Sequence, residues 1–298
     1  MHILVTGGAG FIGSHLVQSL LNDGHDVLVV DDLSSGKRKN IPRGATFKKG
    51  DVRKLAKLRL PEKIDAVFHL AAQIDVRASV EDPAHDAAIN IEGTIAVLMY
   101  AVQAGAKKIV FSSSGGAIYG PCDLVPTTEN SACQSSSPYG VAKFAAEEYI
   151  KLFSRLHSLP YVILRYSNVY GPGQDGSKES GVIAIFSRLA SQGKALTIFG
   201  DGSQTRDFVY VGDVVQANLK ALAYAGSGTF NIGTGKETSI KQLAETLNGL
   251  LPHPVAINYA PARMGEEMRS CLSNDLAKTE LGWQPSVTLE QGLRQTMV

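Results

Sequence analysis

The sequence predicts an α/β fold with a doubly wound parallel sheet. Near its start, a short apolar run breaks into a cluster of glycines and then into a helical pattern of apolar residues. Strand-like and helix-like segments continue to alternate, with five such units before residue 150 and a sixth near residues 161–164. This alternation is typical of a parallel sheet covered by helices on both faces. We therefore expect a Rossmann-like domain, and the 298 residues leave room for a second, smaller domain.

The first turn of this predicted fold is suited to binding a phosphate. Apolar residues recur at helical spacing from Ile12 to Leu21, which places Gly13 in the first turn of a helix. Glycines let the backbone approach a pyrophosphate closely, and the free N–H groups and positive dipole end of the helix face the anion. A glycine-rich turn by itself also occurs as a plain turn. The candidate contacts are Gly7, Gly10, Phe11, Ile12 and Gly13.

Two acidic residues follow the second predicted strand, residues 27–30. Asp31 lies some 18 residues after Gly13, and a carboxylate about 20 residues beyond the glycines is where dinucleotide folds hold the adenosine ribose. Asp31 and Asp32 would also repel a 2′-phosphate, so the pattern favours NAD over NADP. The basic run at residues 37–39 weakens this inference, although such a run is more often a solvated face.

The ends of the next strands supply further candidates for the cofactor site. A third strand at residues 47–50 leads to a carboxylate that either reaches the adenine or forms a polar turn. Residues 64–72 form a continuous apolar strand that runs into small residues, which leave room for a ligand at the carboxyl edge of the sheet. His69 faces the same region, but a packed core histidine is the more common case. The candidates are Asp51, Val52, Leu70, Ala71 and Ala72.

The segment from Pro83 to Ala104 has a helical pattern with one amide inside it. Asn90 is flanked by isoleucines that suggest burial, which makes it a cofactor candidate rather than a surface residue. The following strand, residues 109–111, ends in three serines, of which Ser112 is placed beside the cofactor.

Tyr139 and Lys143 begin the next predicted helix. They are four residues apart and so share one face of it. A phenol has a pKa near 10, but an adjacent ammonium and a nicotinamide cation both stabilise the phenolate. Tyr139 can then act as a general base toward a substrate alcohol. Chance pairs at this spacing are frequent on helices, but this pair follows the serine-rich strand end by one strand–helix unit.

Composition excludes several classes of protein. Hydrophobic residues make up 44% and the net charge is +1 with acids and bases interspersed, so we expect no nucleic-acid groove and no polybasic membrane anchor. The first strand starts at residue 2 and no apolar run approaches the length of a spanning helix, so we expect a cytoplasmic protein without a signal peptide. The three cysteines have no metal-ligand spacing, and we expect incidental thiols and no metal.

Taken together, these residues resemble the extended short-chain dehydrogenases/reductases. Within that family the chain is most similar to the UDP-galactose (UDP-glucose) 4-epimerases and related nucleotide-sugar epimerases. The resemblance covers essentially the whole chain. Its motifs lie at residues 6–13, 69–72, 113–120, 139–143, 165–172 and 205–211.

The resemblance implies two domains and a dimer. Residues 1–167, with about 205–225, would form the NAD-binding domain. Residues of about 168–204 and 226–298 would form the smaller C-terminal α/β domain that binds the nucleotide sugar. Two helices of each subunit, within residues 83–104 and 139–156, would form a homodimer interface.

The resemblance also assigns roles at the site. The catalytic set would be Tyr139, Lys143 and a serine, for which alignment gives either Gly115 or Ser114; we choose Ser114, with Ser113 as second choice and no serine partner as a third possibility. Tyr166 would contact the cofactor, and a small residue at position 270 would admit an N-acetylated sugar. The substrate contacts would be Ser114, Asn168, Phe199, Arg206 and Arg263.

The implied activity is the interconversion of UDP-galactose and UDP-glucose through a transient 4-keto sugar and tightly held NAD. UDP-glucuronate and UDP-N-acetylhexosamines are the alternative substrates. A nucleotide-sugar 4,6-dehydratase is disfavoured, because related dehydratases carry an Asp-Glu pair where this chain has residues 115–117, Gly-Gly-Ala. A non-catalytic NAD-binding sensor is disfavoured because such proteins commonly lose the tyrosine or the lysine.

Overall fold

The computed structural model describes residues 1–122, 124–176, 181–262 and 267–297. Its centre is a seven-stranded parallel sheet in the order β11-β6-β5-β4-β1-β2-β3. Most of the strands are largely apolar and buried on both faces, as a parallel sheet between helices requires, whereas the edge strand β3 is partly exposed. They are β1 (His2–Thr6), β2 (Asp26–Asp31), β3 (Thr46–Lys49), β4 (Ala66–His69), β5 (Lys108–Ser114), β6 (Tyr161–Tyr166) and β11 (Gly228–Ile232).

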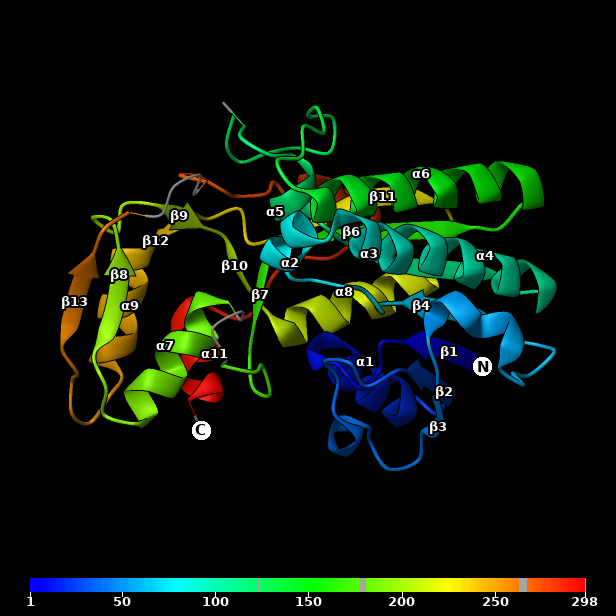
Figure 1. Cartoon of the computed structure of the whole chain (residues 1–298), viewed down its shortest axis with the longest axis horizontal. Coiled ribbons are helices and arrows are strands. Elements are labelled where there is room, and N and C mark those ends of the chain that lie inside the picture. Colours follow the sequence, from blue (N-terminus) through cyan, green and yellow to red (C-terminus); the bar gives the residue numbers. More distant parts are fainter. Residues whose placement is uncertain (123, 177–180, 263–266, 298) are drawn as a thin grey trace.

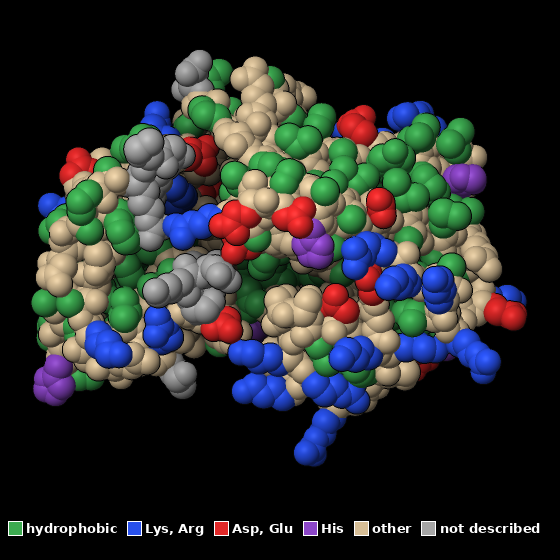
Figure 2. All heavy atoms as spheres, in the orientation of Figure 1, with side chains coloured by type: hydrophobic (Ala, Val, Ile, Leu, Met, Phe, Trp, Pro, Cys, Tyr) green, Lys and Arg blue, Asp and Glu red, His purple; other side chains and the backbone are tan. Residues whose placement is uncertain are grey.

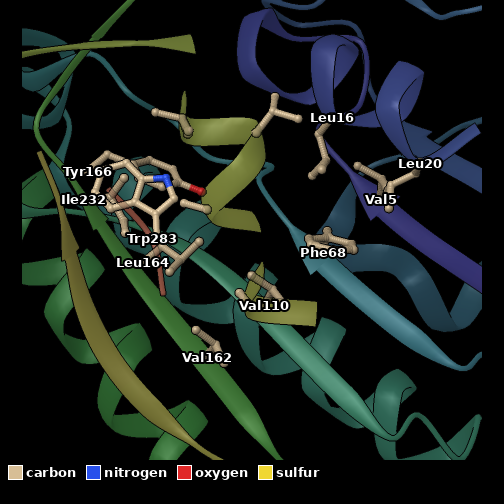
Figure 3. Close-up of a cluster of buried hydrophobic side chains, with 14 of the residues drawn as sticks. Val5, Leu16, Leu20, Phe68, Val110, Val162, Leu164, Tyr166, Ile232 and Trp283 are labelled. Atoms are coloured by element: carbon tan, nitrogen blue, oxygen red, sulfur yellow. The ribbon is translucent and has the colours of Figure 1, made fainter. Parts of the chain in front are cut away.

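Helices cover both faces of this sheet (Figure 1). One core joins the sheet to the first pair of helices, α1 (Phe11–Asn22) and α8 (Val211–Ala223). The opposite core joins it to α4 (Gly93–Gln103) and α6 (Pro138–His157). Figure 3 shows the first core, in which Leu16 and Leu20 of α1 lie above Val5 and Phe68 of the sheet. The predicted doubly wound sheet is therefore confirmed.

Shorter elements lead into these helices. Around β3 lie the short helices η1 (Arg38–Asn40) and η2 (Val52–Lys57). The predicted helix at 83–104 is built as α3 (Pro83–Ala87), a π turn η3 (Ala88–Glu92) and α4, and it is preceded by α2 (Val76–Glu81). A single turn, α5 (Gly115–Ile118), follows β5.

The rest of the chain forms a smaller unit beside the carboxyl edge of the sheet (Figure 1). Its own core includes Phe186, Leu196 and Leu243. Its elements are β7 (Asn168–Tyr170), α7 (Val182–Ser191), β8 (Leu196–Phe199), β9 (Thr205–Arg206), β10 (Phe208–Tyr210), β12 (Thr238–Ser239), α9 (Ile240–Gly249), β13 (Ile257–Ala260) and α11 (Leu289–Thr296), whereas α10 (Asp275–Glu280) packs against β11 of the large sheet. No described helix is long and apolar enough to cross a membrane.

Two segments lie elsewhere than the expected boundaries place them. β11 pairs with β6 at the edge of the large sheet, although residues 226–298 were all expected in the smaller domain. Trp283 packs in the first sheet core and donates its indole N–H to the Asp213 carbonyl on α8 at 2.8 Å (Figure 3). Buried apolar area decides both cases, because β6 would otherwise be an open edge and α8 would lose its cover.

Candidate active site

The turn from β1 to α1 has no room for side chains at two of its glycines. A Cβ at Gly7, which has φ of +73°, would lie 2.6 Å from the Ala71 nitrogen, and a Cβ at Gly13 would lie 2.2 Å from the Gly7 carbonyl oxygen. Gly10 caps α1 without a side-chain hydrogen bond, so the first N–H groups of the helix remain available. This close-packed turn fits the pyrophosphate of a dinucleotide.

Beside this turn, an acid-lined cavity lies where the adenosine is expected. Asp31 is buried and its carboxylate accepts hydrogen bonds from the backbone N–H groups of Ala9 and Leu33, at 3.0 and 2.8 Å. Burial raises the pKa of Asp31, whereas the Arg53 guanidinium lowers the pKa of Asp51. The predicted residues in this lining are Gly7, Gly10, Asp31, Asp32, Asp51, Val52, Leu70, Ala71 and Ala72.

A larger cavity of about 580 Å³ continues from the turn toward α6. Lys37 and Lys39 line it, so the basic run is not only a solvated face. Lys37 pairs with Asp175 at 3.2 Å, which links the β2–η1 loop to the segment after β7. The predicted residues that line this cavity are Gly7, Gly10, Phe11, Ile12, Gly13, Leu70, Ser112, Tyr139, Lys143 and Tyr166.

Tyr139 lines both this cavity and a second one, whereas Lys143 lines this cavity alone. Ser137 caps α6 by accepting from the Gly140 N–H, which fixes Tyr139 in the first turn. Lys143 donates to the Ser112 carbonyl at 2.7 Å and lies 4.4 Å from the centre of the Phe111 ring. Burial lowers the pKa of Lys143 to about 8. Burial and then the Asp86 carboxylate raise the pKa of Tyr139 well above its ordinary value, while the hydrogen bond with Ser114 lowers it.

The geometry separates the serine alternatives. Ser113 donates its hydroxyl to the Glu147 carboxylate at 2.6 Å and so turns away from Tyr139. A side chain at Gly115 would meet the Leu272 side chain, with its Cβ 2.5 Å from Cδ1. Ser114 lines a second cavity together with Tyr139, and its hydroxyl acts to lower the pKa of Tyr139. These contacts support Ser114 as the partner of Tyr139.

A second cavity, of about 370 Å³, opens between the sheet and the smaller unit. Arg206 donates to the Glu267 carbonyl at 2.9 Å, and burial raises the pKa of the Glu267 carboxyl to about 7. Ser270 lies opposite Gly116, whose added Cβ would still be 3.9 Å from its Oγ, so this wall is built from small residues. The predicted residues in the lining are Ser114, Tyr139, Tyr166, Asn168, Arg206 and Ser270.

Several predicted residues lie away from these linings. Asn90 is buried within the π turn, where its amide holds the Gln73 backbone on both sides and donates to Asp86 at 3.0 Å. These contacts hold the segment after β4, and a contact between Asn90 and the cofactor stays a prediction. Phe199 lies on β8, where its backbone carbonyl accepts a hydrogen bond from the Gln204 side chain. A contact between its ring and the uracil base stays a prediction. Arg263 lies outside the described residues.

Other side chains near the site were not anticipated or have another role. His69 is fully enclosed between the Thr6 and Thr94 hydroxyls, at 2.7 and 3.0 Å, and burial lowers its pKa to about 3. It is a neutral core histidine rather than a ligand. The sequence reasoning missed Asp86, which is buried and acts electrostatically on Tyr139 and Lys143. Because Asp86 lies in a helix next to a polar segment, the sequence pattern did not indicate that it is buried near the site.

The fold and the Tyr-x-x-x-Lys site define a dinucleotide-binding enzyme of the extended short-chain dehydrogenase/reductase type. The chain belongs to the NAD dependent epimerase/dehydratase family, whose model matches residues 3–233. It is 46% identical to a putative UDP-glucose 4-epimerase of Methanocaldococcus jannaschii, over 99% of this chain and 97% of that protein.

Two solved structures extend this similarity to three dimensions. The UDP-glucose 4-epimerase of Thermotoga maritima, solved with UDP-glucose, has a TM-score of 0.93 and 46% identity over 100% of this chain and 97% of that one. The Thermus thermophilus UDP-glucose 4-epimerase, solved with NAD, has a TM-score of 0.91 and 39% identity over 100% and 98%. The predicted family and fold are therefore confirmed.

Proposed function

We propose that this enzyme interconverts UDP-galactose and UDP-glucose with resident NAD. The observation that carries the proposal is the position of Tyr139, which lines both the cofactor cavity and the substrate cavity, with Lys143 on one side and Ser114 on the other. A single side chain is thereby placed to move a proton where cofactor and sugar meet. The similarity to the 4-epimerases over the whole chain supports this substrate class.

In the proposed mechanism, Tyr139 takes the proton of the sugar 4-hydroxyl and later returns it to the oxygen of the 4-keto sugar. NAD held by the β1–α1 turn, beside Tyr139 and Lys143, would supply the hydride acceptor and donor for C4 of the sugar. Because burial opposes the phenolate, Tyr139 needs cations nearby; these would be the Lys143 ammonium, one helical turn along α6, and the nicotinamide ring of bound NAD. Arg206 would hold the diphosphate while the sugar turns.

The test is to incubate the purified protein with UDP-galactose, without added cofactor, and to follow the anomeric protons by NMR. We expect UDP-glucose to appear, and at least about 10³-fold slower turnover in Tyr139→Phe with NAD still bound. Conversion that requires added NAD would mean that NAD is not held as a resident cofactor. No conversion even with added NAD would refute UDP-galactose as the substrate.

The small wall around Ser270 favours a second candidate, 4-epimerisation of UDP-N-acetylhexosamines. An acetamido group adds volume at C2 of the sugar, and Ser270 and Gly116 leave that volume open. We expect Ser270→Tyr to lower kcat/KM for UDP-N-acetylglucosamine by at least about tenfold while UDP-galactose keeps most of its rate. Rejection of UDP-N-acetylglucosamine by the unchanged protein would refute this candidate.

We further propose a homodimer through α4 and α6, in the cytoplasm. Figure 2 shows hydrophobic side chains gathered over the region of these helices. Large apolar side chains on this face are exposed, and an exposed apolar patch is typical of a surface that binds another protein. They are Met99, Val141, Tyr149, Leu152 and Leu156.

The three cysteines are free thiols.

A further inference from the structure

Behind the catalytic pair lies a buried ion pair that the proposed chemistry does not use. Glu147 on α6 is completely buried, and Arg165 on β6 is almost so. The guanidinium holds the carboxylate in a two-point contact, with Nε to Oε1 at 3.0 Å and Nη2 to Oε2 at 2.6 Å. Burying two charges costs about as much as their attraction returns, so such a pair is weak evidence for stability. Its contacts indicate a different role.

The first contact ties α6 to the end of β5. Ser113 donates its hydroxyl to Glu147 Oε1 at 2.6 Å. Ser113 lies between Ser112, whose carbonyl accepts from Lys143, and Ser114, which lines the same cavity as Tyr139. Glu147 follows Lys143 by one helical turn on the same face. This hydrogen bond, together with the one from Lys143 to the Ser112 carbonyl, therefore sets the distance between α6 and β5 beside Tyr139.

The second contact ties the same pair to the sugar side of the site. Arg165 donates to the Tyr119 hydroxyl at 2.8 Å, and that hydroxyl donates to Asn231 Oδ1 on β11 at 2.8 Å. Ser113, Arg165 and Asn231 stand in one row across β5, β6 and β11. Tyr119 ends the α5 turn, whose residues 116 and 117 line the substrate cavity.

We propose that the Glu147–Arg165 pair is the positioning centre of the active site. Through Ser113 it holds Lys143 and Tyr139 against β5, and through Tyr119 it holds the α5 wall against the sheet. Neither charge touches cofactor or sugar, so both are positioning residues. The inference rests on the proposed function for its kinetic readout. A misplacement of about 1 Å at such a site can lower the rate about 10²-fold.

The main test is Ser113→Ala, which removes the link and leaves both charges paired. We expect kcat for UDP-galactose to fall about tenfold, KM to stay within about twofold, and Ser113→Thr to restore most of the rate because it restores the hydroxyl. Ser113 also borders the cofactor cavity, so the affinity for NAD is measured by calorimetry and should not change.

The matched control is Ser286→Ala. It deletes another serine-to-carboxylate hydrogen bond of 2.6 Å, to Asp213 on α8, away from both cavities. We expect wild-type kcat for Ser286→Ala and, because Ser286 is exposed whereas Ser113 is buried, a smaller change in its melting temperature than in that of Ser113→Ala. Equal kcat for Ser113→Ala, Ser286→Ala and the wild type would overturn the inference.

A double variant tests the pair itself. Glu147→Gln alone would leave the Arg165 charge buried without a counter-charge, whereas Glu147→Leu with Arg165→Met replaces the pair by apolar groups of similar volume. We expect this double variant to fold and to lose at least as much kcat as Ser113→Ala. A folded double variant with wild-type kcat would also overturn the inference.

A structural readout separates this inference from the proposed function. In a crystal structure of Ser113→Ala, we expect the contact between Lys143 Nζ and the Ser112 carbonyl to lengthen by more than about 0.5 Å. If the wild type converts no UDP-sugar but this displacement is found, the proposed function fails and the positioning role stands. An unmoved Lys143 together with unchanged kcat refutes the positioning role alone.

Discussion

At the scale of single residues, the site depends on how burial changes the charge of a few groups. Burial lowers the pKa of Lys143 and raises that of Tyr139, so both shifts disfavour the charged pair that the chemistry needs. The acids around Lys143, Glu147 on its own helix and Asp86 on α3, raise its pKa again. The protonation states of Tyr139 and Lys143 therefore depend on the balance between burial and nearby charges, and a cation bound nearby can shift this balance.

This balance predicts an alkaline limit to activity. Because the pKa of Lys143 is about 8, its ammonium is present below that pH and is lost as the pH rises through it, so kcat/KM should fall above about pH 8. The contribution of Lys143 to folding stability has the opposite dependence on pH. The unfolded state binds more protons between about pH 8 and 10.5, so the contribution of Lys143 to stability rises with pH there.

The measurement is a pH profile of kcat/KM for UDP-galactose. Lys143→Arg keeps its charge at all these pH values, so its residual activity should lack the limit near pH 8. The same alkaline limit in Lys143→Arg would show that another group titrates.

At the scale of elements, the β1–α1 turn is the most tightly constrained part of the cofactor site. Its helix has no side-chain cap, so its first N–H groups are available to a ligand, and Gly7 and Gly13 are approached closely by backbone atoms. The α6 element is built differently. Ser137 caps it and a proline occupies its first turn, so the catalytic residues begin a well-defined helix.

We predict that Gly13→Ala disrupts this turn. Its Cβ would lie 2.2 Å from the Gly7 carbonyl, so backbone has to move, at a cost of about 1–3 kcal/mol. NAD affinity should fall at least about 100-fold by calorimetry, and the melting temperature should drop by several degrees. Gly249→Ala is the control, because its added Cβ meets no atom within 4 Å, and it should change neither quantity. Unchanged NAD affinity in Gly13→Ala would contradict this account of the turn.

At the scale of the whole molecule, the sheet and the smaller unit enclose the substrate cavity between them. The sheet presents Ser114 and Tyr139 from one side, and Arg206 and Ser270 belong to the other. The sequence crosses between these units several times, and β11 and Trp283 return to the sheet late in the chain. In the proposed function, substrate recognition would therefore depend on how the two units pack, while Tyr139 and Ser114 would move the proton from the sheet side.

The proposed dimer belongs to this scale. Light scattering of the wild type should give twice the chain mass, and Leu152→Glu with Leu156→Glu should give a monomer, because charges would be buried unpaired in the interface. Tyr259→Glu, on exposed β13, is the control and should remain a dimer. A monomeric wild type would refute the dimer. A loss of activity on dissociation would indicate that the interface braces α6.

The sequence alone determined the features that local patterns encode. Strand and helix alternation predicted the sheet, and the glycine turn, the acid after β2 and the Tyr139–Lys143 spacing predicted the cofactor side of the site. These patterns are readable because each depends on backbone conformation or helical periodicity within a short segment.

Only the tertiary structure decided how distant segments meet. The Leu272 side chain fills the space next to Gly115, which favours Ser114 over Gly115 as the partner of Tyr139. Two threonine hydroxyls enclose His69. The tertiary structure also brought Glu147 to Ser113 and Arg165. Each of these outcomes depends on contacts between residues far apart in the chain, and on which polar groups burial leaves to one another. A local sequence pattern carries neither kind of information.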